Sequence, residues 1–175
     1  MPDRNIPVLL KYIGGYLFGF VVFLFVFPLF LYGLTIPFPF RIMVDQDHLL
    51  LVISMIFGVA GLVFVLWSNL GLLQRGRGGP IDLFNIPVTP RTSRLVTTGP
   101  YRYTRNPMAF GILTTYIAWA VYLDSLAALM AVILSFFFVA MYLKMTEERR
   151  LLKDFGNDYE EYRSRVSMII PWLTR

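Results

Sequence analysis

Four long apolar runs, each free of charged residues, constrain this chain more than any other feature of its sequence. The first run lies between Lys11 and Arg41, and the second lies between Asp47 and Arg75. The third lies between Arg105 and Asp124, and the fourth lies between Asp124 and Lys144. Each run has at least about 18 residues, which lets an α-helix cross the hydrocarbon core of a bilayer. We therefore predict four membrane-spanning helices, over roughly residues 12–34, 48–70, 107–123 and 125–145.

The composition agrees with a lipid environment and excludes several kinds of chemistry. Hydrophobic residues make up 57% of the 175 positions, against about 45–50% in soluble proteins. The chain has no cysteine and one histidine. It can therefore build no disulfide, no thiolate nucleophile and no Cys- or His-cluster metal site, and we predict no bound metal.

Positive charges gather in alternate connecting segments. Six arginines lie between the second and third predicted spans, seven Lys or Arg residues follow the fourth, and only Arg41 lies between the first and second. By the positive-inside rule, both termini, the loop 71–106 and the C-terminal segment 146–175 are predicted to be cytoplasmic. Because topology accounts for the net charge of +5, we predict a lipid bilayer as partner and no nucleic acid.

The segment after the fourth span is predicted to form an amphipathic helix. Its apolar residues recur at roughly helical spacing: Leu151, Leu152, Phe155, Tyr159 and Tyr162. The chain is therefore predicted to be all-α: a polytopic membrane helix bundle of about four transmembrane helices with a cytoplasmic C-terminal amphipathic helix. We expect one integral membrane domain over residues 1–175, and the oligomeric state stays open.

The third and fourth spans are predicted to form a tight hairpin, because only Asp124–Ser125 separates them. Pro107 and Thr146 lie at similar distances from this turn, so the far ends of the two helices should meet. We expect the pair Glu147–Glu148 to face the Tyr103–Pro107 step across one cytoplasmic mouth. At that step, Asn106 is predicted to be the N-cap and Pro107 the first residue of the third helix.

The residues alone leave two interpretations of this mouth open. The glutamates could pair with Arg102 or Arg105 as a structural clamp, and surface ion pairs of this kind contribute only about 0–1 kcal/mol. They could instead belong to a polar site at the membrane surface.

Two motifs favour the second interpretation. The first occupies residues 95–111 and contains Leu95, Val96, Gly99, Tyr101, Arg105, Pro107 and Gly111; the second contains Glu147, Glu148, Leu151, Phe155, Gly156, Tyr159 and Tyr162. In this pattern the chain resembles the isoprenylcysteine carboxyl methyltransferase and phospholipid methyltransferase superfamily of integral membrane methyltransferases. That superfamily carries Leu-Val-x-x-Gly-x-Tyr, Arg-His-Pro-x-Tyr-x-Gly and Glu-Glu-x-x-Leu-x-x-x-Phe-Gly-x-x-Tyr-x-x-Tyr segments. The resemblance covers roughly residues 78–175.

The resemblance implies S-adenosyl-L-methionine as methyl donor and a lipid-like or small amphiphilic methyl acceptor. The implied donor-binding residues are Val96, Gly99, Tyr101, Arg105, Asn106, Pro107, Glu147 and Glu148. Arg102 and Glu147 are the candidate catalytic residues, through orientation of the acceptor. These residue types suit the donor, because glutamate fits its cationic centre or its hydroxyls, arginine fits its carboxylate and tyrosine can stack on adenine.

The chain departs from the superfamily pattern at two positions. Asn106 replaces the histidine of the Arg-His-Pro step, and Ala109 replaces the tyrosine that follows it, with Phe110 adjacent. Asparagine can still form hydrogen bonds but cannot titrate, which makes isoprenylcysteine a less secure acceptor. The alanine removes one pocket contact unless Phe110 supplies it.

Two alternative functions are weighed against methyl transfer. NADPH-dependent sterol reductases of membranes carry a similar Arg-His-Pro step, but Met108, Ala109 and Ile112 stand where their further motif residues are expected. A non-enzymatic membrane module could use the arginine-rich loop to bind anionic lipid headgroups, with each basic residue worth about 1 kcal/mol.

Overall fold

A computed structural model describes residues 8–42, 47–79, 82–83 and 86–172. The first predicted span forms α1 (Val8–Val21), the π-helical turn η1 (Val22–Val26) and α2 (Phe27–Thr35). The second forms α3 (Asp47–Gly71) and the π-helical turn η2 (Leu72–Gly76), and the third forms α4 (Pro107–Tyr122). The fourth forms α5 (Leu126–Tyr142) and the π-helical turn η4 (Leu143–Glu147), followed by α6 (Glu148–Phe155) and α7 (Asn157–Arg165).

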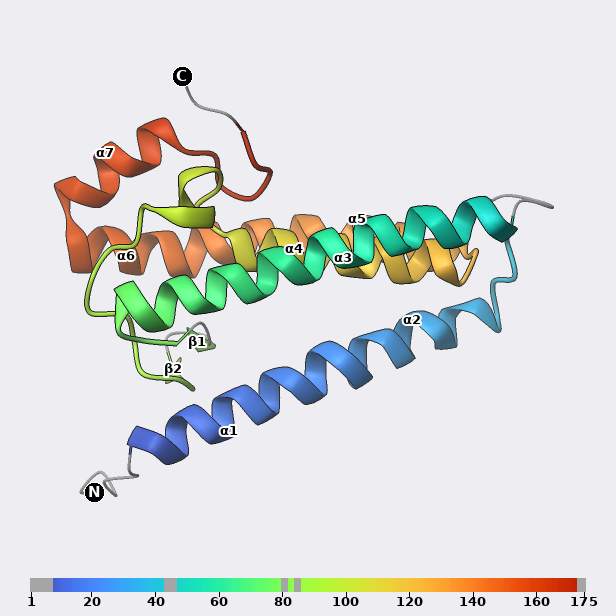
Figure 1. Cartoon of the computed structure of the whole chain (residues 1–175), viewed down its shortest axis with the longest axis horizontal. Helices are drawn as coiled ribbons and strands as arrows, with labels where there is room; N and C mark the ends of the chain where they lie inside the picture. The colour runs from blue at the N-terminus through green and yellow to red at the C-terminus, as the bar shows by residue number, and fades with distance from the viewer. Residues whose placement is uncertain (1–7, 43–46, 80–81, 84–85, 173–175) are drawn as a thin grey trace.

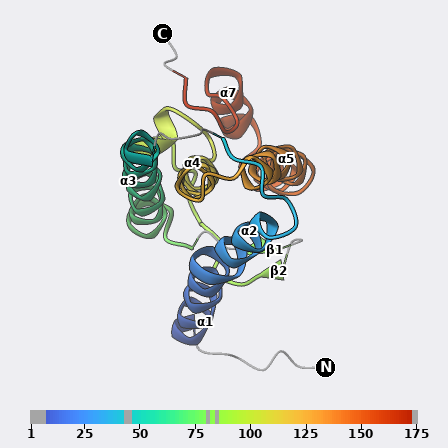
Figure 2. The same cartoon turned by 90° about the vertical axis from the view of Figure 1, so that its right-hand side faces the viewer.

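These elements confirm the predicted all-α membrane helix bundle (Figure 1). Three continuous helices are long and apolar enough to cross a membrane, over residues 12–35, 47–76 and 126–155. α4 has 16 residues, about 24 Å at the helical rise, which is shorter than a typical hydrocarbon core. Figure 2 shows α4 surrounded by α2, α3 and α5, so the shortest of the four predicted spans is the central one.

Glycine allows α3 and α4 to pack closely. A Cβ added at Gly61 would lie 2.6 Å from the carbonyl oxygen of Gly111, and one added at Gly111 would lie 2.6 Å from the carbonyl oxygen of Gly61. No real side chain tolerates such contacts, so both positions require glycine at this crossing. The first turns of α4 are thereby held against the middle of α3.

The first span joins the bundle mainly through its second half. Leu31 of α2 is fully buried, and the indole Nε1 of Trp119 donates to the carbonyl of Pro28 at 3.2 Å. α1 diverges from the other helices (Figure 1). The turn η1 ends at Val26, two residues before Pro28, which lies in the first turn of α2, where a missing backbone donor is tolerated.

The loop between η2 and α4 and the chain after α7 meet at the start of α4. The loop contains the two-residue strands β1 (Asp82–Leu83) and β2 (Ile86–Pro87), which pair antiparallel, and the 3₁₀ turn η3 (Gly99–Arg102). Residues 103–106 then run beside residues 167–172. Their backbones are joined by three hydrogen bonds of 2.9–3.1 Å: Arg105 to Ser167, Asn106 to Met168, and Trp172 to Tyr103.

Candidate active site

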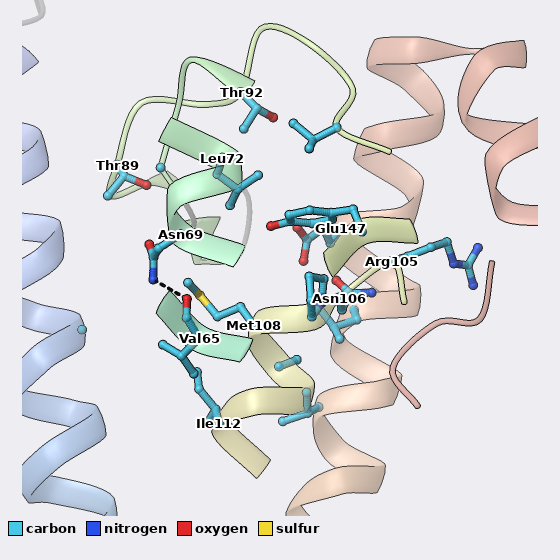
Figure 3. A pocket seen from close by; sticks show the side chains of 18 of the residues that line it. Val65, Asn69, Leu72, Thr89, Thr92, Arg105, Asn106, Met108, Ile112 and Glu147 are labelled. Carbon is cyan, nitrogen blue, oxygen red and sulfur yellow. Dashed lines mark hydrogen bonds between the residues drawn. The ribbon is translucent and has the colours of Figure 1, made fainter. Parts of the chain in front are cut away.

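A cavity of about 820 Å³ lies where the α4–α5 hairpin, the loop and the C-terminal helices meet. This volume is within the range of about 300–1,000 Å³ that is typical of pockets for drug-sized ligands. One end is apolar and lies between the first span and the other helices; it is lined by Phe23, Leu62, Ile112, Tyr116 and Val139. The other end is polar and contains residues from both sequence motifs (Figure 3).

The hairpin brings the glutamate pair to the Arg105–Pro107 step, which confirms that part of the geometric prediction. An Nη2 atom of Arg105 lies 2.8 Å from Oε1 of Glu148, and both side chains are about nine-tenths buried. Glu147 instead lines the cavity together with Asn106 and Pro107. The two glutamates are adjacent in the chain, so their side chains face about 100° apart. Glu148 therefore forms the ion pair of the clamp interpretation, whereas Glu147 faces the cavity.

The Arg105 side chain lines the cavity with its stem, while Figure 3 shows its guanidinium pointing away from Glu147 and Met108. Besides the pairing with Glu148, its Nε and Nη1 atoms are buried without a hydrogen-bond partner among the described residues. Such a buried pair is costly to disrupt, because removing one partner leaves an uncompensated charge in a low-dielectric environment.

Three tyrosines complete the wall at the polar end of the cavity. The hydroxyl of Tyr162 donates to the backbone carbonyl of Tyr101 at 2.6 Å. The hydroxyl of Tyr159 is buried and has no hydrogen-bond partner among the described residues. Burial raises the pKa of Tyr159, the nearby charge of Glu148 raises it further, and the adjacent Arg105 guanidinium opposes the increase.

The side chain of Asn106, the N-cap residue of α4, bonds to the C-terminal segment. Its side chain makes no N-cap hydrogen bond to α4; its Nδ2 donates to the carbonyl of Met168 at 3.0 Å. The hydroxyl of Thr104 donates to the same carbonyl at 3.0 Å. Asn106 and Pro107 thus occupy the N-cap and first helical positions of α4 as predicted, but the cap has no side-chain hydrogen bond, because the amide of Asn106 is held by the C-terminal segment.

The structure places most of the predicted site residues in one cavity. The lining includes Val96, Tyr101, Arg105, Asn106, Pro107 and Glu147, but not Gly99, Arg102 or Glu148. Gly99 has a φ of +67° and forms the turn that starts η3, which suits glycine. Arg102 is exposed. Ala109 and Phe110 lie in the first turn of α4, and of these two only Ala109 lines the cavity.

Several lining residues were not among the predicted site residues. Asn69 is the clearest, because it is a polar residue near the end of α3; its Oδ1 accepts from the Tyr16 hydroxyl at 3.2 Å, and its Nδ2 donates to the Val65 carbonyl (Figure 3). A polar side chain inside an apolar run is a general indicator of a functional path. Among the described residues, no group of three or more His, Cys, Asp or Glu side chains could hold a metal ion.

Comparison with known proteins gives matches of one kind. Residues 49–158 match a protein family described as phospholipid methyltransferase. Methanethiol S-methyltransferase 1 of Bradyrhizobium diazoefficiens is 36% identical over 72 residues, which cover 41% of this chain and 24% of that protein. Methanethiol S-methyltransferase of Mycobacterium tuberculosis is 33% identical over 75 residues, which cover 43% of this chain and 30% of that protein.

The matched part of the chain thus spans less than a third of the length of either relative. No solved structure matches the chain significantly.

Proposed function

The chain belongs to the phospholipid methyltransferase family, and from this premise we propose that it is a membrane enzyme that methylates a lipid-like or small amphiphilic acceptor. The proposed methyl donor is S-adenosyl-L-methionine, and the proposed place of reaction is the cytoplasmic face of the membrane. The observation that carries the proposal is one cavity whose polar end holds residues from both motifs and whose apolar end lies between membrane-spanning helices.

The residues of the polar end fit the methyl donor. The donor supplies a methyl group on a sulfonium and also carries an ammonium, a carboxylate, ribose hydroxyls and adenine. Glu147 offers a carboxylate to the cationic groups and Tyr101 offers an aromatic face, while Arg105 contributes its stem to the wall and keeps its guanidinium beside Glu148. The cavity volume of about 820 Å³ leaves room for an acceptor beside the donor.

The apolar end supports an acceptor that partitions into the bilayer. Phe23, Leu62 and Val139 come from three different spans and line it, so an apolar group could contact the protein there at the depth of the hydrocarbon. The relatives named for methylation of methanethiol support a small acceptor as well as a lipid-like one. Positioning the acceptor in line with the methyl group is the main contribution that such a site can make.

Glu147 is the proposed catalytic residue. Among the described lining residues it is the only carboxylate, so it is the candidate to orient an amine or thiol acceptor and to take its proton. Arg102 remains a proposed orienting residue, and its exposed position outside the cavity suits contact with a headgroup at the membrane surface rather than with the reacting atoms.

We extend the proposal to the arrangement in the membrane. Residues 1–175 would form one integral membrane domain, with the loop 71–106, the segment 146–175 and both termini on the cytoplasmic side. The charge asymmetry of the connecting segments supports this orientation. It would place the polar end of the cavity in contact with the cytosol, where the soluble donor is found.

Incubation of the purified full chain with host membranes and radiolabelled donor tests this proposal. We expect label in an extracted small or lipid-like product, and little label with the Glu147→Gln variant. Calorimetric titrations with S-adenosylhomocysteine and with NADPH should show binding of the first ligand only. A folded protein that binds no donor, or that binds NADPH instead, contradicts the proposal.

A further inference from the structure

A polar pair lies in the cavity wall outside the two sequence motifs. Tyr16 belongs to α1 and Asn69 to α3, and both fall within helices that are apolar enough to cross a membrane. Both residues line the cavity and are only partly buried. The Tyr16 hydroxyl donates to Oδ1 of Asn69 at 3.2 Å, and Nδ2 of Asn69 donates to the Val65 carbonyl at 3.2 Å. The proposed donor site uses neither residue of the pair.

The fold gives little reason for an amide at position 69. The Val65 carbonyl already accepts from the hydroxyl of Ser68 at 2.9 Å, so Asn69 does not satisfy a group that would otherwise be unbonded. Polar side chains are costly in a membrane-spanning helix, and those that occur there usually face a cavity and mark a functional path. The position of Asn69 therefore points to a bonding partner inside the cavity.

The hydrogen-bonding capacity of the pair indicates what that partner is. A carboxamide has two N–H donors and a carbonyl oxygen with two lone pairs. Within the described part of the chain, Asn69 uses one donor on Val65 and one lone pair on Tyr16. Its second N–H can donate to a neutral hydroxyl or carbonyl oxygen. A charged group would lose its hydration here without meeting an opposite charge on the pair, which makes it the weaker candidate.

The pair lies across the cavity from the proposed donor residues. Figure 3 shows Asn69 on the opposite side of the cavity from Glu147. It also shows Val65 and Ile112 on the way from Asn69 to the apolar end, and both residues line the cavity. A ligand that bonds to Asn69 can therefore extend its chain along the apolar end and turn its methyl-accepting atom toward the donor.

We propose that Tyr16 and Asn69 form a subsite for a neutral oxygen of the methyl acceptor, either a hydroxyl or a carbonyl. This inference rests on the proposed function and narrows its substrate class to amphiphiles that carry such an oxygen besides the group that is methylated. Asn69 donates its second N–H to this oxygen. Tyr16 orients the amide from α1 through the bond at 3.2 Å.

The test measures how two competitors inhibit the labelling of host membrane extract by radiolabelled donor, with the full chain in detergent. Octanol and octane share one chain and differ in the hydroxyl. The ratio of their half-inhibitory concentrations should favour octanol more strongly in the wild-type protein than in Asn69→Leu, by about fivefold. Partition of the competitors into detergent is the same for both proteins, so it cancels in this comparison.

Ser68→Ala is the matched control, because Ser68 bonds to the same Val65 carbonyl but is fully buried and does not line the cavity. It should leave the ratio unchanged. Tyr16→Phe removes the group that orients the amide, and it should change the ratio in the same direction as Asn69→Leu. It serves as the second test where Asn69→Leu folds poorly, as judged by thermal unfolding. Calorimetry should show unchanged affinity for S-adenosylhomocysteine in all three variants.

Distinct results separate this inference from the proposed function. Equal changes for both competitors in Asn69→Leu overturn the subsite, because loosening of α1 alone would have that effect. Failure of octanol to inhibit the wild-type protein overturns it as well. So does loss of S-adenosylhomocysteine binding in folded Asn69→Leu, or a labelled product without an oxygen outside the methylated group. A wild-type protein that binds no S-adenosylhomocysteine and labels no product overturns the proposed function itself.

Discussion

The side chain of Glu147 lines the cavity, whereas that of its neighbour Glu148 pairs with buried Arg105. The π-helical turn η4 ends at Glu147, and α6 begins at Glu148. π-turns occur often at functional sites, because the extra residue changes which side chains face a cavity. We therefore expect these two adjacent residues to have separable effects, Glu147 on the proposed ligand binding and Glu148 on stability.

The glutamine variants of the two residues should separate these effects. Glu148→Gln removes the charge that compensates Arg105, and we expect a loss of about 3–5 kcal/mol in the free energy of unfolding. Glu147→Gln should change stability little and weaken binding of S-adenosylhomocysteine. Thermal unfolding and calorimetry measure the two quantities. Glu160→Gln is the exposed control, because its pairing with Arg163 at 3.7 Å is at the surface and should change stability by less than about 1 kcal/mol.

The buried tyrosines predict a loss of stability at high pH. Burial raises the pKa of Tyr101 well above its ordinary value of 10.0, and the charge of Glu147 raises it further; burial also raises the pKa of Tyr159. The unfolded chain then ionises first, so stability is full below about pH 10 and falls as the pH rises from there toward the raised pKa values. Melting temperatures between about pH 8 and pH 12 measure this effect. Tyr159→Phe should flatten the alkaline decline without lowering stability at pH 8, and an unchanged decline would contradict a contribution of Tyr159 to it.

At the scale of the element, the crossing of α3 and α4 is the contact least able to accept a larger residue. In Gly111→Ala the new methyl would meet the Gly61 carbonyl oxygen at 2.6 Å and the Val65 nitrogen at 2.8 Å. Because both are backbone atoms, the helices must separate, and we expect a loss of about 1–3 kcal/mol or more. Gly33→Ala is the matched control in α2, because nothing lies within 4 Å of its added Cβ. It should be neutral or stabilising by up to about 1 kcal/mol, and thermal unfolding compares the two.

The hairpin turn between α4 and α5 also attaches the end of the first span to the bundle. Asp124 lies in this turn with a φ of +47°; its carboxylate pairs with Nε of Arg41 and accepts from the Ile42 amide at 2.9 Å. Asp124→Ala removes both contacts at a left-handed position that aspartate tolerates better than alanine. We expect a loss of about 1–3 kcal/mol in thermal unfolding. Asp47→Asn, at a carboxylate that is 84% exposed, should have a much smaller effect.

For the molecule as a whole, the hydropathy pattern predicted the helices, because a charged residue cannot be hidden in lipid without cost. The short turn at Asp124 predicted that Arg105 meets the glutamate pair, because a tight turn makes α4 and α5 antiparallel and so brings their far ends together. The docking of residues 167–172 on residues 103–106 could not be predicted, because backbone hydrogen bonds hold it and these leave no pattern of residue types in the sequence. The separate environments of Glu147 and Glu148 depend on a π-turn, and the burial of Tyr159 beside Arg105 depends on tertiary neighbours; no local pattern encodes either.

The orientation of the whole molecule in the membrane is the remaining prediction, and the absence of cysteine allows a direct test of it. Figure 1 shows the turn after α2 at the opposite end of the bundle from α6 and α7. Single cysteines at exposed positions on each end, Pro39→Cys, Ser93→Cys and Ser164→Cys, can be labelled with a membrane-impermeant maleimide. We expect labelling of Pro39→Cys in intact cells, and labelling of Ser93→Cys and Ser164→Cys only after permeabilisation, because the arginine-rich segments should face the cytoplasm. The reverse pattern would place the polar end of the cavity outside the cell, away from the proposed donor, and would contradict both the topology and the cytoplasmic site of methyl transfer.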